Sequence, residues 1–429
     1  MQIVQVNPRI FCNSPWYELN IYWNGDYGFC CQQWQKPYDG SGTYNIRHMS
    51  MAEWHNSQPM RDARLRMFRD QRWNHCDQCW SEEDTSETSR RHRANQKSVI
   101  FRQQFDQSFK QSPNHSTFEY SASNQGRTQQ LPIDLHVDLG NYCNLACKMC
   151  WSGASSRIAT QEKKWGILAD DGHLGSDWTR DDATWHKFLA DVEALPIKNI
   201  HFMGGETLIQ PRFAQFVDHM IAHGRTDLSL SFVTNGTTFN QALVEKLVRF
   251  NRIGIEVSIE ATTRVNDYVR QGTDTATVLH NIDEYSRHVE TVTVRPTLSA
   301  LTIRDFWTLL DYCLQKRLLI KALVVNDPPH LRVGVLPRHI REGYKKNYHH
   351  LLTEYTVRDI NESDPHNYRS LIPMYAEQAV RLLDQPDAPG MDLMVAHMAR
   401  WDQVYGFNAV DLYPELKDQL DEHGYPGQN

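Results

Sequence analysis

The sequence has no apolar run long enough to span a membrane and no excess of positive charge. Its 429 residues have a mean hydropathy of −0.61, whereas a transmembrane helix needs about 20 apolar residues. Fifty-two acidic residues outnumber 45 basic ones, which argues against a broad nucleic-acid-binding surface. The first residues lack a basic stretch followed by a long apolar one, so we expect no secretory signal. With 40% hydrophobic and 23% charged residues, we expect a globular cytoplasmic protein.

The cysteines are unevenly distributed along the chain. They stand at positions 12, 30, 31, 76, 79, 143, 147, 150 and 313. Because cytosolic thiols are kept reduced, this clustering favours metal or cluster ligation over disulfides. Cys313 falls on the apolar face of a predicted helix with Trp307 and Leu310, and we interpret it as a core residue.

The segment LGNYCNLACKMC places three cysteines in one short loop. Cys143, Cys147 and Cys150 follow residues 133–138, which alternate as a strand does. Iron–sulfur clusters normally take four cysteines, so three thiolates would leave one iron of a four-iron cluster open to a small molecule. The alternative is a zinc site that takes a fourth ligand such as His136.

Later predicted strands also end in short polar motifs. Residues 199–203 lead into Gly204, Gly205 and Glu206; residues 228–233 lead into Thr234, Asn235 and Gly236; residues 255–260 contain Ser258 and precede Arg270. Glycines allow the backbone to approach a ligand closely, and an arginine is suited to bidentate pairing with a carboxylate.

In this order, the motifs resemble the signature of the radical S-adenosylmethionine (SAM) superfamily. The resemblance implies that the three-cysteine loop holds a [4Fe–4S] cluster whose open iron binds SAM. It further implies SAM contacts from Met149, Gly204, Gly205, Glu206, Thr234, Asn235, Ser258 and Arg270. In these contacts Glu206 belongs to the segment that holds the amino group, Ser258 contacts the ribose and Arg270 pairs with the carboxylate. Met149 departs from the family, in which this position is usually aromatic, although a thioether can fill the same place.

Strand–helix alternation predicts parallel βαβ units between residues 131 and 337, with two further strands at residues 292–298 and 320–325. Amphipathic helical stripes separate the strands, for example at residues 213–221 and 243–248. The resemblance implies a partial (β/α)6 TIM-like barrel with its site at the carboxyl ends of the strands. We expect residues 338–429 to form a helical C-terminal region, in which we find no catalytic motif.

The N-terminal cysteines resemble a second kind of cluster site, the SPASM or twitch module. Cys76 and Cys79 form a CxxC pair, and the spacing of Gly25 favours Cys30 over its neighbour Cys31. With Cys12, the resemblance implies one fully ligated auxiliary [4Fe–4S] cluster. A zinc ribbon with four cysteine ligands is the alternative.

The module would occupy residues 1–95 and precede the barrel, whereas such modules commonly follow it. Residues 96–130 are rich in polar side chains and predict a connector, partly flexible. The basic run at residues 90–93 is interpreted as a solvated face.

The resemblance implies a radical SAM oxidoreductase. An electron donor such as flavodoxin or ferredoxin would reduce the first cluster, which would cleave SAM to a 5′-deoxyadenosyl radical. That radical would abstract hydrogen from a peptide or protein side chain, and the auxiliary cluster would accept an electron for net oxidation. The first alternative is dehydrogenation of a small molecule such as an aminocyclitol. The second is a non-catalytic zinc or iron–sulfur binding protein.

Overall fold

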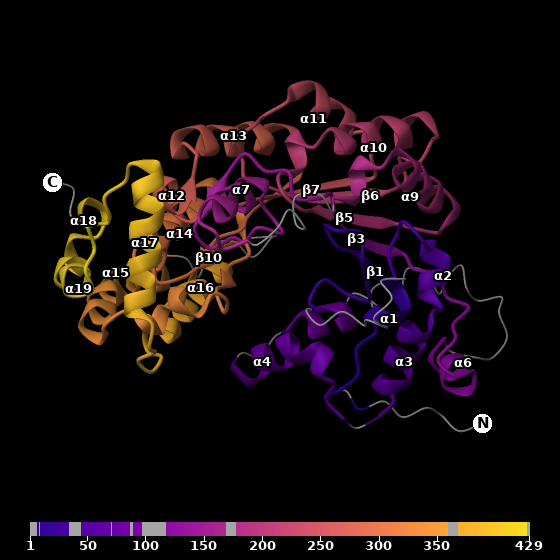
Figure 1. Ribbon diagram of the computed structural model, residues 1–429, viewed down its shortest axis with the longest axis horizontal. Coiled ribbons are helices and arrows are strands. Elements are labelled where there is room, and N and C mark those ends of the chain that lie inside the picture. The colour runs from indigo at the N-terminus through magenta and orange to yellow at the C-terminus, as the bar shows by residue number, and fades with distance from the viewer. Residues whose placement is uncertain are drawn as a thin grey trace. The chain divides into compact units, whose positions relative to one another are not determined.

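The computed structural model describes residues 7, 9–33, 44–69, 71–85, 89–96, 117–168, 177–358 and 368–426 (Figure 1). The chain forms two compact units. The first contains residues 1–142, 169–231 and 249–252, and the second contains residues 143–168, 232–248 and 253–429. Strand β6 (Ser229–Thr234) contributes residues to both units because the chain passes from one to the other within it.

The first unit is built on a mostly parallel sheet. Strands β1 (Glu18–Ile21), β3 (Asp134–Asp138) and β5 (Asn199–Met203) are parallel neighbours, and β2 (Tyr27–Gly28) is antiparallel to β1. Residues 229–231 of β6 lie beside β5. In β3 and β5, burial alternates from residue to residue, because successive side chains of a strand point to opposite faces of the sheet. One face is therefore an apolar core and the other a polar surface.

Two helices cover the apolar face of this sheet. Helix α9 (Asp182–Ala194) begins after Asp181, whose side chain accepts a hydrogen bond from the Thr184 amide. Helix α10 (Pro211–Ala222) begins with proline, which needs no amide partner in the first turn. The ring of Phe202 on β5 lies 5.0 Å from the ring of Phe216 on α10. The stripe predicted at residues 213–221 is therefore the buried face of a helix.

The N-terminal part of the first unit consists of short helices. They are α1 (Ser14–Tyr17), α2 (Met51–His55), α3 (Gln58–Met67), α4 (Asp77–Thr85) and α6 (Thr117–Ser123). Buried Arg64 on α3 joins α1, α2 and the turn after α6, because its guanidinium donates to the carbonyl oxygens of Pro15 (2.9 Å), His55 (2.6 Å) and Gly126 (3.1 Å). These carbonyl oxygens satisfy the donors of a buried cation. The predicted connector lies largely outside the described residues, which omit 97–116.

His55 makes the stability of this part sensitive to acid. Its ring is buried, and burial together with the charge of Arg64 lowers its pKa well below the ordinary value. As pH falls below about 6.5, His55 of the unfolded chain binds a proton, whereas the buried ring of the folded chain stays neutral. The free energy of unfolding therefore decreases. We expect His55→Gln to remove up to about 1.4 kcal/mol per pH unit of this decrease.

Urea titrations followed by tryptophan fluorescence at neutral and mildly acidic pH measure this difference. His48→Gln is the control, because His48 is an exposed histidine of the same unit. Equal pH dependence in the wild type and His55→Gln would contradict the prediction.

The second unit continues the α/β pattern. Strands β7 (Arg252–Val257), β9 (Thr291–Val294) and β11 (Leu319–Ile320) are parallel neighbours, and β7 also neighbours β6. The connecting helices are α11 (Gln241–Leu247), α12 (Arg264–Val269), α13 (Thr275–His288) and α14 (Phe306–Lys316). Cys313 is buried on α14, which confirms its interpretation as a core residue.

The predicted α/β class is confirmed, although several boundaries differ. The strand predicted at 199–203 is β5, whereas β7 begins and ends earlier than the predicted 255–260. The single strand predicted at 292–298 is divided into β9 and β10 (Thr297–Leu298), because Pro296 cannot donate a ladder hydrogen bond. Similarly, residues 320–325 are divided between β11 and β12 (Leu323–Val324). No closed barrel is found among the described strands.

The C-terminal region is helical, as predicted. It contains α15 (Arg338–Arg358), α16 (Tyr368–Leu383), α17 (Met391–Tyr405), α18 (Ala409–Leu412) and α19 (Lys417–Glu422). None of the helices in the described ranges is both long and apolar enough to cross a membrane.

Candidate active site and auxiliary cysteine site

The three-cysteine loop is held by backbone pairing within the second unit. Strand β4 (Ala146–Cys147) is antiparallel to β8 (Arg270–Gln271), so Cys147 lies opposite Arg270. The Lys148 amide donates to the carbonyl of Val269 at 2.8 Å, and the Cys150 amide donates to that of Cys147 at 3.0 Å. The predicted SAM-binding arginine is thus paired directly with the cysteine loop.

The Thr234–Gly236 turn also contacts this loop. The Asn235 side chain donates to the side-chain oxygen of Asn144 at 2.8 Å, and Asn144 donates to the Thr237 hydroxyl at 3.0 Å. Gly236 has a positive φ of 73°, and a Cβ there would come within 2.8 Å of Val257. The turn therefore needs glycine at position 236. Its hydrogen bonds fix Asn144, the residue that directly follows Cys143.

Arg270 has a partner that the sequence analysis missed. Its Nε and Nη2 donate to Oε1 of buried Glu260 at 2.9 and 2.5 Å, and its Nη1 lies 3.6 Å from the Cys147 sulfur. Burial disfavours the guanidinium charge, but Glu260 and Cys147 outweigh it and raise the pKa of Arg270. Arg270 is therefore a fixed cation beside the loop. The sequence signal for Glu260 was its place two residues after Ser258.

We expect Arg270→Ala to weaken SAM binding by about 1.5–3 kcal/mol, the range for a hydrogen bond to a charged group. Equilibrium dialysis of SAM against reconstituted, oxygen-free protein measures this change, and iron content should stay constant. Arg295→Ala is a matched control, because Arg295 donates to Glu256 at 2.6 Å in another carboxylate pair of the same unit. An unchanged SAM dissociation constant would remove Arg270 from the binding site.

Lys148, between Cys147 and Met149, connects the loop to the C-terminal helices. Its buried ammonium lies 2.8 Å from Asp402 on α17 and 4.1 Å from the centre of the Tyr268 ring. Asp402 also accepts hydrogen bonds from the hydroxyls of Tyr268 (3.1 Å) and Tyr425 (2.6 Å). Because breaking a buried ion pair leaves an uncompensated charge, the C-terminal region is part of the support for the cysteine loop.

We expect Asp402→Ala to lower the free energy of unfolding by about 3–5 kcal/mol, because buried Lys148 would lose the carboxylate that compensates its ammonium. Iron bound at the loop should also be lost faster to a chelator. Asp421→Ala is the control, since Asp421 pairs with Lys417 on the exposed surface, where an ion pair contributes little to stability.

The double variant Lys148→Met/Asp402→Leu should recover much of the lost stability, because an apolar pair of similar volume leaves no buried charge. Stability of Asp402→Ala equal to that of Asp421→Ala would show that the ion pair does not support the loop.

Met149 and Ser258 are each partly exposed, whereas Lys148 is buried. Ser258 follows β7, and its amide donates to the carbonyl of Thr234 at 2.8 Å. The predicted contacts Thr234, Asn235, Ser258 and Arg270 thus belong to the same unit as the three cysteines.

The Gly204–Glu206 segment belongs to the first unit and is shaped by its own chain. A Cβ on Gly204 would lie 2.6 Å from the carbonyl oxygen of Gly140, and one on Gly205 would lie 2.0 Å from that of Tyr142. The glycines are therefore required by the close approach of residues 139–142. Glu206 is buried and accepts a hydrogen bond from the Leu208 amide at 3.1 Å.

The four predicted N-terminal ligands all belong to the first unit, where Cys12 and Cys76 pack against one apolar cluster of Phe11, Trp16 and Met67. Burial raises the pKa of the Cys12, Cys30 and Cys76 thiols, and that of Cys79 rises to about 12. Neighbouring thiols add to this rise in pKa: Cys31, Cys76 and Cys12 act on Cys30, and Cys12 and Cys79 act on Cys76. Because these thiols are buried, they disfavour negative charge. They therefore suit a site at which a bound metal or cluster supplies the compensating positive charge.

Thiol pKa values are also raised in the three-cysteine loop. Burial raises the pKa of Cys147, and burial together with Cys147 raises that of Cys150 to about 12. The Cys143 sulfur accepts the Leu145 amide at 3.4 Å, the kind of hydrogen bond that tunes cluster sulfurs. This donor set also fits an iron–sulfur cluster.

The interpretation of residues 90–93 as a solvated face is wrong for Arg91. Arg91 is buried and lies 2.7 Å from Glu83, while Arg90 lies 2.7 Å from Glu18. Both arginines interact electrostatically with the N-terminal cysteines. The long-range glutamate partners could not be seen from the local basic run.

Two comparisons with known families agree with this arrangement. Residues 137–313 match the radical SAM superfamily, and residues 12–80 match the SPASM iron–sulfur cluster-binding domain. The chain therefore contains a radical SAM domain that is preceded by a SPASM iron–sulfur cluster-binding domain. SAM and [4Fe–4S] clusters, the cofactors predicted from the sequence, are confirmed for these domains. The ligand and SAM-contact assignments of individual residues stay predictions.

Solved structures with partial similarity include two SAM enzyme complexes. One is "Native anSMEcpe with bound AdoMet and Cp18Cys peptide", 17% identical over 52% of this chain and 61% of that chain, with a TM-score of 0.38. Another is Streptococcus suis SuiB bound to S-adenosylmethionine, 12% identical over 60% of this chain and 58% of that chain, with a TM-score of 0.34. Both matches cover less than two thirds of the other protein. No curated protein matches the sequence.

Proposed function

We propose that this protein is a cytoplasmic radical SAM enzyme that oxidises a peptide or protein side chain. The observation that carries the proposal is the difference between its two cysteine sets. The loop set offers three cysteines in the segment that pairs with Arg270, whereas the N-terminal set offers Cys12, Cys30, Cys76 and Cys79 as four ligands within the first unit. Three ligands leave a four-iron cluster open to SAM, and four ligands close it.

When bound, the loop cluster and SAM supply a 5′-deoxyadenosyl radical that abstracts hydrogen from the substrate. Arg270 is proposed to hold the SAM carboxylate, because its guanidinium is fixed by Glu260 and its Nη1 lies beside the Cys147 sulfur. Ser258 and the Thr234–Asn235 turn are proposed to contact the rest of SAM. Met149, partly exposed beside Cys150, is proposed to pack near the adenine.

The N-terminal cysteines are proposed to hold an electron acceptor and not a substrate. Four thiols leave no iron open for ligation. The fixed cations Arg90 and Arg91 lie in the electrostatic surroundings of these thiols and favour their charged forms. Flavodoxin or ferredoxin is the proposed donor that reduces the loop cluster.

A peptide or protein side chain is the proposed substrate because a SPASM domain accompanies the radical SAM domain, as in enzymes that modify ribosomally made peptides. Deoxyadenosine yield with candidate peptides and with aminocyclitols distinguishes this substrate class from small-molecule dehydrogenation. Stimulation by aminocyclitols alone would overturn the peptide assignment.

Two cysteine variants test the separate roles proposed for the two sites. Cys143→Ala/Cys147→Ala/Cys150→Ala should retain about four irons at the N-terminal site and form no deoxyadenosine. Cys76→Ala/Cys79→Ala should still form deoxyadenosine with dithionite, whereas oxidised product should fall sharply. Cys313→Ala is the control, because Cys313 is a buried core residue of α14.

SAM affinity and circular dichroism must be measured on the same proteins, since loss of a cluster can disturb packing. SAM cleavage by the triple variant would overturn the loop assignment. Full product yield from a folded Cys76/Cys79 variant would overturn the electron-acceptor role.

A further inference from the structure

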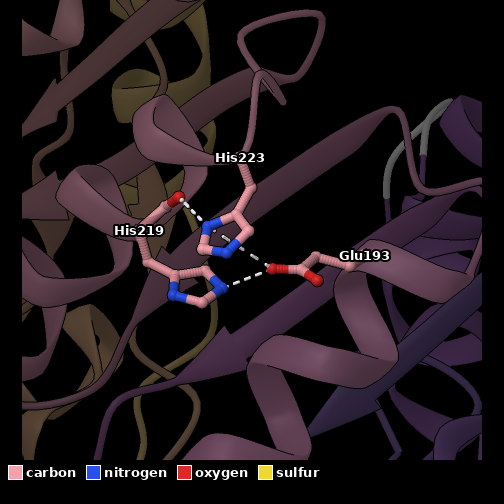
Figure 2. Close-up of side chains that lie close together, drawn as sticks. All are labelled: Glu193, His219 and His223. Carbon is pink, nitrogen blue, oxygen red and sulfur yellow. Dashed lines mark hydrogen bonds and ion pairs between the residues drawn. The ribbon is translucent and has the colours of Figure 1, made fainter.

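Two histidines and a glutamate converge on the surface of the first unit, apart in sequence from every cysteine (Figure 2). Glu193 lies in the last turn of α9, and His219 and His223 lie at the end of α10. One ligand atom from each residue lies within 4.8 Å of the others. His219 Nε2 is hydrogen-bonded to Glu193 Oε1, and His223 Nδ1 lies 3.8 Å from that same oxygen.

The two helices are fixed at this end by an arginine. Arg225 follows α10 and donates to the carbonyl oxygens of Val192 (2.9 Å), Glu193 (3.2 Å) and Ile197 (3.0 Å). Within α10, the i and i+4 positions of the two histidines put their rings on one face, with ring centres 4.0 Å apart. The three side chains are therefore held together by the backbone and do not depend on their own contact.

The hydrogen bonding of His223 suits a metal ligand. Its Nδ1 lies 2.8 Å from the carbonyl oxygen of His219, and with the proton on Nδ1 this bond leaves Nε2 with a free lone pair. Ligating histidines commonly donate their other ring nitrogen to a carbonyl in this way.

We propose that Glu193, His219 and His223 form a surface site for a divalent transition metal, with zinc as the best-suited ion. Two imidazoles and one carboxylate are common zinc ligands. The side chains are 34%, 28% and 51% exposed, respectively, so an ion can enter from solvent and water can complete its coordination. The bound ion would join the end of α9 to the end of α10 and stabilise the first unit.

Zinc binding to the cluster-loaded protein tests this site. Oxygen-free equilibrium dialysis against zinc alone, with elemental analysis, should find one more zinc per chain in the wild type than in His219→Ala/His223→Ala. Glu193→Gln should weaken zinc binding and raise the dissociation constant at least tenfold. Because ligands that bind only the folded state raise its stability, zinc should raise the melting temperature of the wild type but not of the double variant.

His280→Ala/His288→Ala is the matched control, because it removes two exposed histidines from α13 that are eight residues apart. It should bind zinc as the wild type does. Iron content and visible absorbance must be followed in the same samples, since zinc can also displace iron from cysteines. Equal zinc binding by the wild type and His219→Ala/His223→Ala, or zinc uptake matched by loss of iron, would overturn the proposal.

Discussion

A buried lysine charge between two cysteines is the constraint on which the active-site unit depends. Lys148 cannot turn toward solvent, because the backbone on either side is fixed by the β4–β8 pairing and by its own amide bond to Val269. Its charge is therefore matched by Asp402, 254 residues later in the chain. This single requirement makes helix α17 a structural partner of the cysteine loop, although the C-terminal region contains no ligand motif of its own.

The same unit uses short polar contacts to fix the other side of the loop. Asn235 and Thr237 reach Asn144, so the turn after β6 and the loop after β3 share one hydrogen-bonded junction. Gly236 permits this junction because a larger residue would meet Val257 and Val278. The cysteine loop is thus held from the turn after β6, from β8 and from α17, which leaves its sulfurs little freedom to move.

Much of this could be predicted from the sequence where the signal was local. The radical SAM domain could be predicted from the spacing of Cys143, Cys147 and Cys150, and strand β5 from the alternation of residues 199–203. Both patterns extend over only a few residues. Glu260, Asp402 and Arg91 were missed as partners because their roles depend on residues 10, 254 and 8 positions away, respectively. Glu193, His219 and His223 were missed for the same reason, since the carboxylate belongs to another helix.

Both cysteine sets are accompanied by arginines whose charge is already paired with glutamate. Arg270 with Glu260 lies beside Cys147, and Arg90 with Glu18 interacts with Cys30. An isolated buried guanidinium would be costly without a cluster, whereas a guanidinium paired with glutamate keeps each site near neutral before a cluster is present. Because hydrogen bonds and nearby charge set cluster potentials, the Arg–Glu pairs beside the two sets of cysteines also fix part of the surroundings on which those potentials depend.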